Sequence, residues 1–107
     1  MNYGHLNPQA LPMFVYNERD FKVGEEVRLF VLQGPEDRRR LQVVEGAITY
    51  TPSANSLDLP KSIGLDVYRS GRIVKSGSEA KLSLKPSQRT INVPFDKIGA
   101  VEKLSLN

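Results

Sequence analysis

The chain has no cysteine and no tryptophan, and its single histidine is His5. Without cysteine it can form neither disulfides nor thiolate metal ligands, so apolar burial alone must hold the fold. One histidine cannot supply an ordinary zinc site, and a Ser-His-Asp triad would have to use His5, although no serine lies in a G-x-S-x-G motif. We therefore predict no catalytic residues, no metal site and no cofactor. A carboxylate pair assembled from distant strands stays open as an enzyme alternative, because such pairs leave no local motif.

Long apolar runs are also missing. No run approaches the ~20 residues that a membrane-spanning helix needs, and the first ten residues lack the basic stretch and apolar core of a secretion signal. We therefore expect a soluble chain without a transmembrane segment, whose cellular compartment stays open. The length of 107 residues is typical of one domain. We interpret residues 1–11 as an N-terminal arm, because prolines bracket it and it has no periodicity, and residues 12–107 as a single domain.

Helical periodicity is absent too. Short apolar runs alternate with Gly, Pro, Asn and Ser from one end of the chain to the other. Strand-length runs recurring about every 8 to 12 residues are typical of an antiparallel β-sandwich or barrel. The pattern predicts an all-β fold of about 7–9 short strands. Their expected positions are residues 12–16, 26–33, 41–45, 47–51, 57–59, 63–69, 72–75, 80–85, 90–95 and 101–106, with residues 41–51 forming either one bulged strand or two.

Several of these segments carry more detailed predictions. Residues 26–33 have apolar side chains on both faces, which is typical of a central strand. Gly46 marks either a bulge within one long strand or a tight turn. Ser70 and Gly71 are predicted to form the turn of a β-hairpin. Residues 86–89 are expected to separate two strands, and residues 96–99 to form the turn before the last strand.

Two segments resemble a known class of module. Residues 22–32 (KVGEEVRLFVL) and 91–106 (INVPFDKIGAVEKLSL) are similar to the early and late strands of immunoglobulin-like and fibronectin type III-like domains. The resemblance implies an antiparallel immunoglobulin-like β-sandwich of seven to nine strands, with a small β-barrel as the alternative. It also implies an adhesion, spacer or docking module. The cysteine pair and tryptophan of antibody-type domains are missing, so no residue role carries over.

The first functional hypothesis is a non-enzymatic protein interaction or structural module. A protein partner, or another copy of the chain, would dock on the arm or on an unpaired sheet edge. The candidate docking residues on the arm are Tyr3, His5, Leu6 and Leu11. In this interpretation, deletion of residues 1–10 leaves thermal stability nearly unchanged and weakens assembly.

The alternative hypothesis is nucleic-acid binding through residues 61–89. The net charge is +3, yet residues 1–50 carry six basic and seven acidic side chains, whereas residues 51–107 carry nine and five. A basic field attracts anions, although charged strands are most often simply solvent-exposed. The candidate anion- or partner-binding residues are the run Arg38, Arg39 and Arg40 and the segment with Tyr68, Arg69, Arg72 and Lys75. Lys81, Lys85 and Arg89 would extend that segment.

Overall fold

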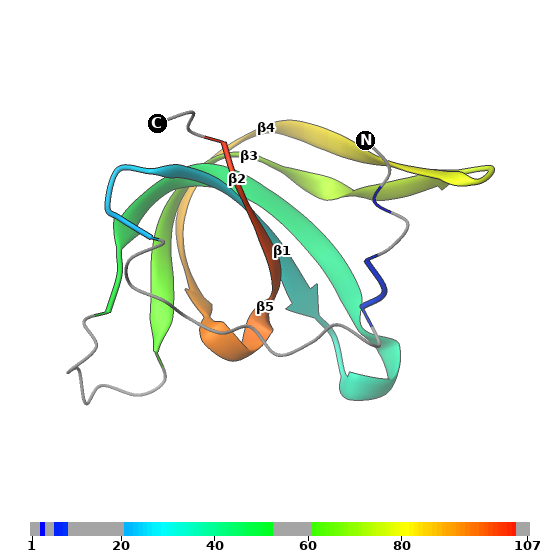
Figure 1. The fold of residues 1–107 in the computed structure, drawn as a ribbon, viewed down its shortest axis with the longest axis horizontal. Coiled ribbons are helices and arrows are strands. Elements are labelled where there is room, and N and C mark those ends of the chain that lie inside the picture. The colour runs from blue at the N-terminus through cyan, green and yellow to red at the C-terminus, as the bar shows by residue number, and fades with distance from the viewer. Residues whose placement is uncertain (1–2, 4–5, 9–20, 53–60, 105–107) are drawn as a thin grey trace.

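The part of the protein that the structure describes forms one antiparallel sheet of five strands in the order β4-β3-β2-β1-β5 (Figure 1). The computed structural model describes residues 3, 6–8, 21–52 and 61–104. Two short 3-10 helices, η1 and η2, connect strands. The elements are β1 (Glu26–Gln33), η1 (Glu36–Arg38), β2 (Arg40–Tyr50), β3 (Ser62–Ser76), β4 (Glu79–Pro94), η2 (Phe95–Lys97) and β5 (Ile98–Lys103).

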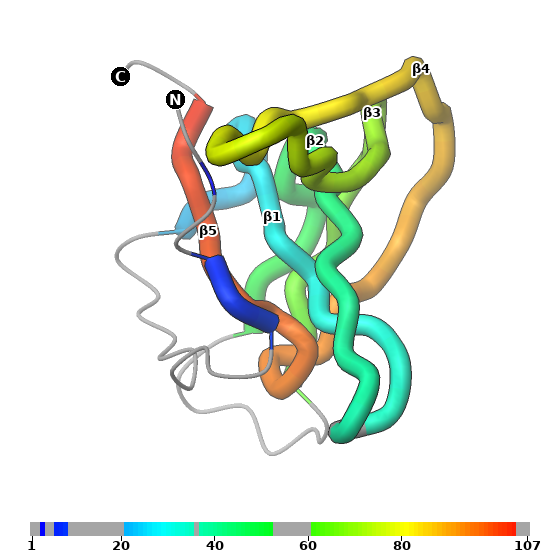
Figure 2. The backbone as a smooth tube through the Cα atoms, turned by 90° about the vertical axis from the view of Figure 1, so that its right-hand side faces the viewer, coloured from blue at the N-terminus to red at the C-terminus, as the bar shows by residue number. Residues whose placement is uncertain are grey.

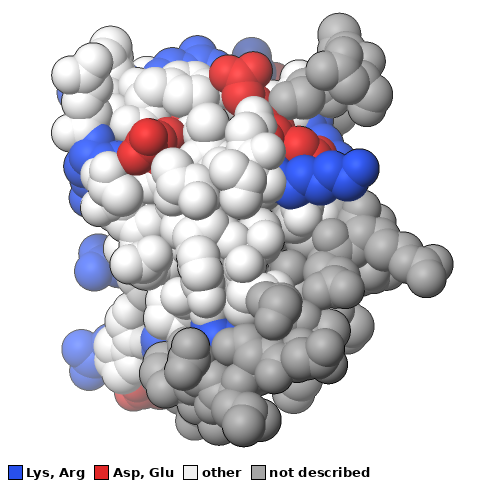
Figure 3. Space-filling model, turned by 90° about the vertical axis from the view of Figure 1, so that its left-hand side faces the viewer, with Lys and Arg blue, Asp and Glu red and all other residues white. Residues whose placement is uncertain are grey.

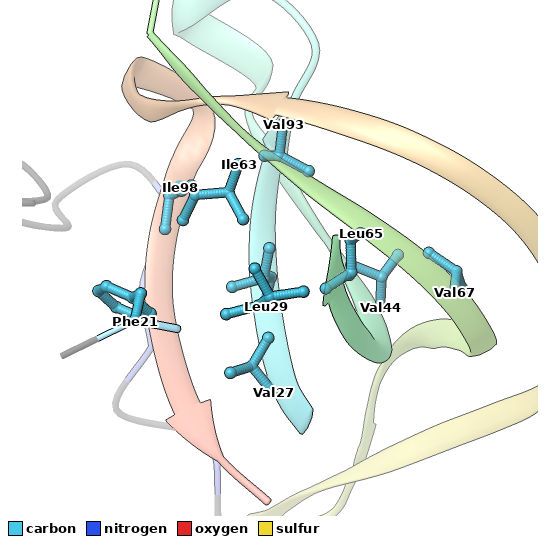
Figure 4. Close-up of a cluster of buried hydrophobic side chains, with 10 residues drawn as sticks. Phe21, Val27, Leu29, Val44, Ile63, Leu65, Val67, Val93 and Ile98 are labelled. Carbon is cyan, nitrogen blue, oxygen red and sulfur yellow. The ribbon is translucent and has the colours of Figure 1, made fainter. Parts of the chain in front are cut away.

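The sheet curls around a main core on its inner face. Apolar side chains alternate along the strands, and those on one side of each strand point toward one another inside the curl (Figure 4). Leu29 of β1 and Leu65 of β3 are completely buried there. The buried members of this cluster are Phe21, Val27, Leu29, Val44, Ile48, Ile63, Leu65, Val67, Val93 and Ile98.

A second, smaller core lies on the outer face of the same sheet. Phe30 of β1 and Val43 of β2 point away from the main core and pack with Tyr3 and Ala80. The Tyr3 and Phe30 rings are 5.6 Å apart between centroids, and the backbone N–H of Tyr3 donates to the carbonyl of Ala80 at 3.0 Å. In Figure 2 the described N-terminal residues, in blue, lie in front of β5 and to the left of β1, and Leu6 packs against this second core.

The expected sandwich of seven to nine strands is corrected by this arrangement. The all-β class is confirmed, but the described residues form five strands in a single open sheet. Apolar residues on both faces of residues 26–33 do mark an internal strand, since β1 lies between β2 and β5. The second apolar face is covered by Tyr3 and by the far end of the β3–β4 hairpin, which removes the need for a second sheet. The strands expected at residues 12–16 and 57–59 lie outside the described residues.

The alternatives at Gly46 are resolved in favour of a bulge. β2 continues through Gly46, and its register against β3 shifts between Glu45 and Gly46. A Cβ atom on Gly46 would lie 2.1 Å from the carbonyl oxygen of Asp66. The bulge therefore brings the β3 backbone closer than any side chain would allow.

The hairpin turn predicted at Ser70 and Gly71 is wrong. Both residues lie inside β3, where Gly71 pairs with Val43 on one side and Leu84 on the other. The hairpin turns instead at Gly77, whose φ of 64° suits glycine. The sequence alone does not distinguish the two cases, because glycine occurs both in turns and where two strands approach each other closely.

The predicted break at residues 86–89 is also wrong, because β4 runs without interruption to Pro94. Pro86 is tolerated for two reasons: β4 is an edge strand, and the β3–β4 register shifts beside it, between Val67 and Arg69. The turn expected at residues 96–99 is η2, and the last strand begins earlier than expected, at Ile98.

The burial of Tyr3 changes the expected effect of removing the arm. Tyr3 is 7% exposed and belongs to the second core. We now expect deletion of residues 1–10 to lower the free energy of unfolding by about 1.5–3 kcal/mol, the amount gained on burying a large apolar side chain. Urea denaturation followed by circular dichroism measures the change, and Tyr3→Ala in the full chain should reproduce most of it. An unchanged urea midpoint in both variants would contradict the packing of Tyr3.

Candidate anion-binding surface

Two basic segments that are distant in sequence meet at one end of the sheet. η1 and the residues after it carry Arg38, Arg39 and Arg40 into β2, and Arg40 pairs with Gln33 of β1. Two residues further on, Gln42 pairs with Arg72 of β3. In Figure 1 the β1–β2 connection and the tip of the β3–β4 hairpin both lie on the right, with the blue N-terminal residues between them. Parts of the two candidate surfaces from the sequence thus meet here, namely Arg39 and Arg40 of the first and Arg72 and Lys75 of the second.

A hollow of about 500 Å³ lies on the inner face at this end. We call it the inner hollow. Its cations are Arg40, Arg72 and Lys85, all of them exposed. No described carboxylate pairs with these three, and none of the described residues around the hollow is acidic. The lining residues are Gln33, Arg40, Leu41, Gln42, Ser70, Gly71, Arg72, Ser83 and Lys85.

The strand register explains why these side chains share a face. Directly opposite residues of neighbouring strands lie on the same side of a sheet. Arg72 is opposite both Gln42 and Ser83, and Ser70 is opposite Lys85. Ser70 is also opposite Val44, which belongs to the main core. The inner face therefore changes from apolar to basic and polar along its length.

A neighbouring hollow of about 380 Å³ continues the inner surface. It shares Gln33 and Gln42 with the inner hollow and adds the cations Arg89 and Lys97, again without an acidic side chain among the described lining residues. Serine hydroxyls, glutamine amides and five cations thus follow one another along this face. Such groups donate hydrogen bonds to anionic oxygens.

A further hollow of about 480 Å³ lies on the outer face, and we call it the outer hollow. Two of its cations, Arg40 and Arg72, also line the inner hollow. The floor is more apolar, because the second core supplies part of it. The lining residues are Tyr3, Leu6, Asn7, Pro8, Arg39, Arg40, Leu41, Arg72, Ile73, Lys75 and Ala80.

Three of the seven predicted anion-binding residues do not line these hollows, and the first of them, Arg38, has its Nε 4.0 Å from Oδ2 of Asp37. Arg69 forms an ion pair with the buried carboxylate of Glu45. Tyr68 is 36% exposed, and burial, followed by the nearby Glu26 carboxylate, raises the pKa of its hydroxyl. The bulge opposite Pro86 places both residues away from the inner hollow. Tyr68 is therefore not positioned to stack a base beside Arg72.

Glu45 is the centre of a buried charge network on the outer face. Its carboxylate is fully buried, and Arg28 Nη2 lies 2.6 Å from Oε2 while Oε1 contacts Arg69. Arg28 also donates to the Tyr3 hydroxyl at 3.2 Å and to Glu102 Oε1 at 3.3 Å. Burial raises the pKa of the Tyr3 hydroxyl, because the ionised form would be desolvated. Burial alone would lower the pKa of Arg28, but the Glu45 carboxylate outweighs it and the net pKa is raised. This network is structural, since its charges neutralise one another.

The candidate docking residues of the arm divide into two groups. Tyr3 is buried and Leu6 is half-buried, so both pack within the chain. His5 and Leu11 lie outside the described residues. In the part of the chain that the structure describes, no group of three or more metal-ligating side chains comes together. The same part contains no helix with the length and apolar character to cross a bilayer.

Sequence reasoning missed the polar partners of the cations, namely Gln33, Gln42, Ser70 and Ser83. The alternation within each strand was visible, but the strand pairing that gathers these residues was not, and the irregularity between Val67 and Arg69 moves the inward face of β3 from Leu65 and Val67 to Ser70 and Arg72. The opposite side of the molecule differs in charge from the basic surface. On the opposite side of the molecule the middle of the face carries few charges, and acidic side chains lie beside the basic ones (Figure 3).

No protein-family model, no curated protein and no solved structure matches the chain.

Proposed function

We propose that the protein is a non-enzymatic module that binds the phosphate backbone of a nucleic acid along the inner face of its sheet. One observation carries the proposal. Five cations from three separated segments, together with serine and glutamine side chains, line two adjoining hollows in which none of the described lining residues is acidic.

The linear arrangement favours a polyanion over a single anion. Arg40 and Arg72 lie at one end of the surface, and Arg89 and Lys97 line the hollow that adjoins it. A ligand with regularly repeated charges can contact several of these groups at once, whereas one phosphate can contact only neighbours. Neutralising several phosphates releases condensed counterions, which supplies most of the free energy of non-specific nucleic-acid binding. Arginine adds bidentate hydrogen bonds to phosphate oxygens.

Fewer residues now support the protein-docking hypothesis. Tyr3 and Leu6 pack within the chain, and the outer edge of β4 carries Pro86 and several basic side chains that oppose strand pairing. Docking through His5 and Leu11 stays a prediction. The geometry therefore favours the basic surface as the functional site.

Binding of labelled oligonucleotides across a salt series tests the proposal. We expect binding at low salt that weakens as salt rises, with log K falling linearly with log salt. Arg72→Gln and Arg40→Gln should each weaken binding and reduce the magnitude of the salt slope by about 1. Fluorescence anisotropy at four salt concentrations measures both quantities.

The matched control is Lys22→Gln, which removes the same charge from an exposed residue outside the three basic hollows. Its slope of log K against log salt should lie within about 0.3 of the slope of the unaltered protein. Absence of binding at low salt overturns the proposal, and so does an equal effect of all three substitutions. Vesicles of anionic phospholipid form a second arm: binding to vesicles without binding to oligonucleotides would replace the nucleic acid with a membrane surface.

A further inference from the structure

We propose that the outer hollow binds one unstacked base of a single-stranded nucleic acid whose phosphates contact Arg40 and Arg72. This inference rests on the proposed function and names the class of nucleic acid. It concerns a different surface from the inner hollow, because the residues specific to the outer hollow lie on the other face of the sheet.

The two hollows are connected through shared side chains. Arg40, Leu41 and Arg72 line both of them. A phosphate held between the two guanidinium groups would therefore have the polar inner hollow on one side and the outer hollow on the other. In a nucleic acid strand each phosphate is flanked by nucleosides, so the base next to that phosphate is the group that reaches the outer hollow.

The lining of the outer hollow suits a base better than it suits another phosphate. Leu6, Pro8, Leu41 and Ile73 are all half-buried and supply apolar surface. Bases have extended apolar faces, which apolar and aromatic side chains and arginine guanidinium planes contact favourably. Arg39 and Lys75 complete the rim, and none of the described lining residues is acidic.

The chemistry also selects single strands. A base in a duplex must lose its pairing and stacking before it can leave the helix, at a cost of a few kcal/mol. A base in a single strand has no pairing to lose. The outer hollow therefore adds affinity for single strands and little for duplexes, whereas the inner hollow contacts phosphates of either.

Three probes with the same number of phosphates test the inference by fluorescence anisotropy at one salt concentration. They are an oligothymidylate, the same sugar-phosphate strand without bases, and a duplex of the same number of phosphates. We expect the oligothymidylate to bind at least about fivefold more tightly than the abasic strand, the lower limit for one contacted base. Equal binding of the oligothymidylate and abasic strands overturns the inference while leaving the proposed function intact. Failure of all three probes to bind overturns the proposed function itself.

Neighbouring residues of β3 offer a matched pair of variants. Ile73 lines the outer hollow, whereas Val74 is 40% exposed and does not. Ile73→Ser should lower affinity for oligothymidylate about threefold to tenfold and leave the abasic strand unaffected. Val74→Ser should change neither. Equal losses for both probes in Ile73→Ser would assign the effect to folding and overturn the base site.

Photo-crosslinking locates the base without altering the protein. An oligonucleotide carrying 4-thiothymidine, irradiated in the complex and digested, should yield crosslinked peptides that contain residues 6–8 or Ile73. Crosslinks confined to Ser83, Lys85, Arg89 or Lys97, which line the inner surface, would overturn the inference.

Discussion

Glu45→Ala should lower the free energy of unfolding by about 3–5 kcal/mol, the range for removing one partner of a buried ion pair. Glu45 is fully buried, and the Arg28 side chain opposite it is 15% exposed. Removing the carboxylate leaves the Arg28 guanidinium in low-dielectric surroundings with only Glu102 and Tyr3 nearby. Urea denaturation of the full chain, followed by circular dichroism, measures the loss.

Two further variants separate burial of charge from loss of packing. Glu102→Ala removes a carboxylate that is 30% exposed and lies 3.3 Å from the same arginine, so its cost should stay below about 1 kcal/mol. Arg28→Leu combined with Glu45→Leu should recover much of the stability lost in Glu45→Ala, because an apolar pair of similar volume leaves no buried charge. A Glu45→Ala protein that unfolds at the urea concentration of the unaltered chain would refute the buried network.

The alternation of apolar and polar side chains within one β-strand was predictable from the sequence, because it depends only on residues that are adjacent in the chain. Val27, Leu29 and Val31 point to one face of β1, and Phe30 and Leu32 to the other. By the same alternation Arg28 lies on the outer face with Phe30. Its charge partner was not predictable, because the contact with Glu45 depends on the pairing of β1 with β2.

The number of strands was overestimated because turn-forming residues do not distinguish a turn from an interruption within a strand. Ser70, Gly71 and Pro86 lie inside long strands, where a close approach of backbones or an edge position accommodates them. Whether a backbone approaches another closely, or lies at an edge, depends on how the strands pair, which the local sequence does not specify. Local patterns therefore predicted two short strands in place of β3 and two in place of β4.

The candidate site, like the fold, could be predicted from the sequence only in part. The basic excess of the second half and the run of Arg38, Arg39 and Arg40 were visible in the sequence. Their convergence was not, because it depends on the β2–β3 register that puts Gln42 opposite Arg72. Tyr68 and Arg69 were grouped with Arg72 by proximity in the chain, and one bulge separates them from it.

Gly71→Ala tests the architecture that brings the basic surface together. A Cβ atom at this position would lie 1.8 Å from the backbone carbonyl oxygen of Ser83, so the two strands would have to separate. We expect a loss of about 3 kcal/mol or more in unfolding free energy, at the upper end for overpacking. Because Arg72 and Lys85 lie beside this pair, oligonucleotide binding should fall in the same variant.

Gly64→Ala provides the matched control in the same strand. Its Cβ would meet side-chain atoms of Thr49 and Tyr50 at 2.8 and 2.9 Å. The Thr49 hydroxyl can rotate away, and the Tyr50 Cβ needs only a small shift of an exposed residue at the end of β2, so the change should cost less than Gly71→Ala, about 1–2 kcal/mol. A comparable small effect at Gly71 would mean that the β3 and β4 backbones are not held together there, and that Ser70 and Gly71 form a turn after all. The inner hollow would then lose its floor, since Ser70 and Ser83 would no longer lie between Arg72 and Lys85.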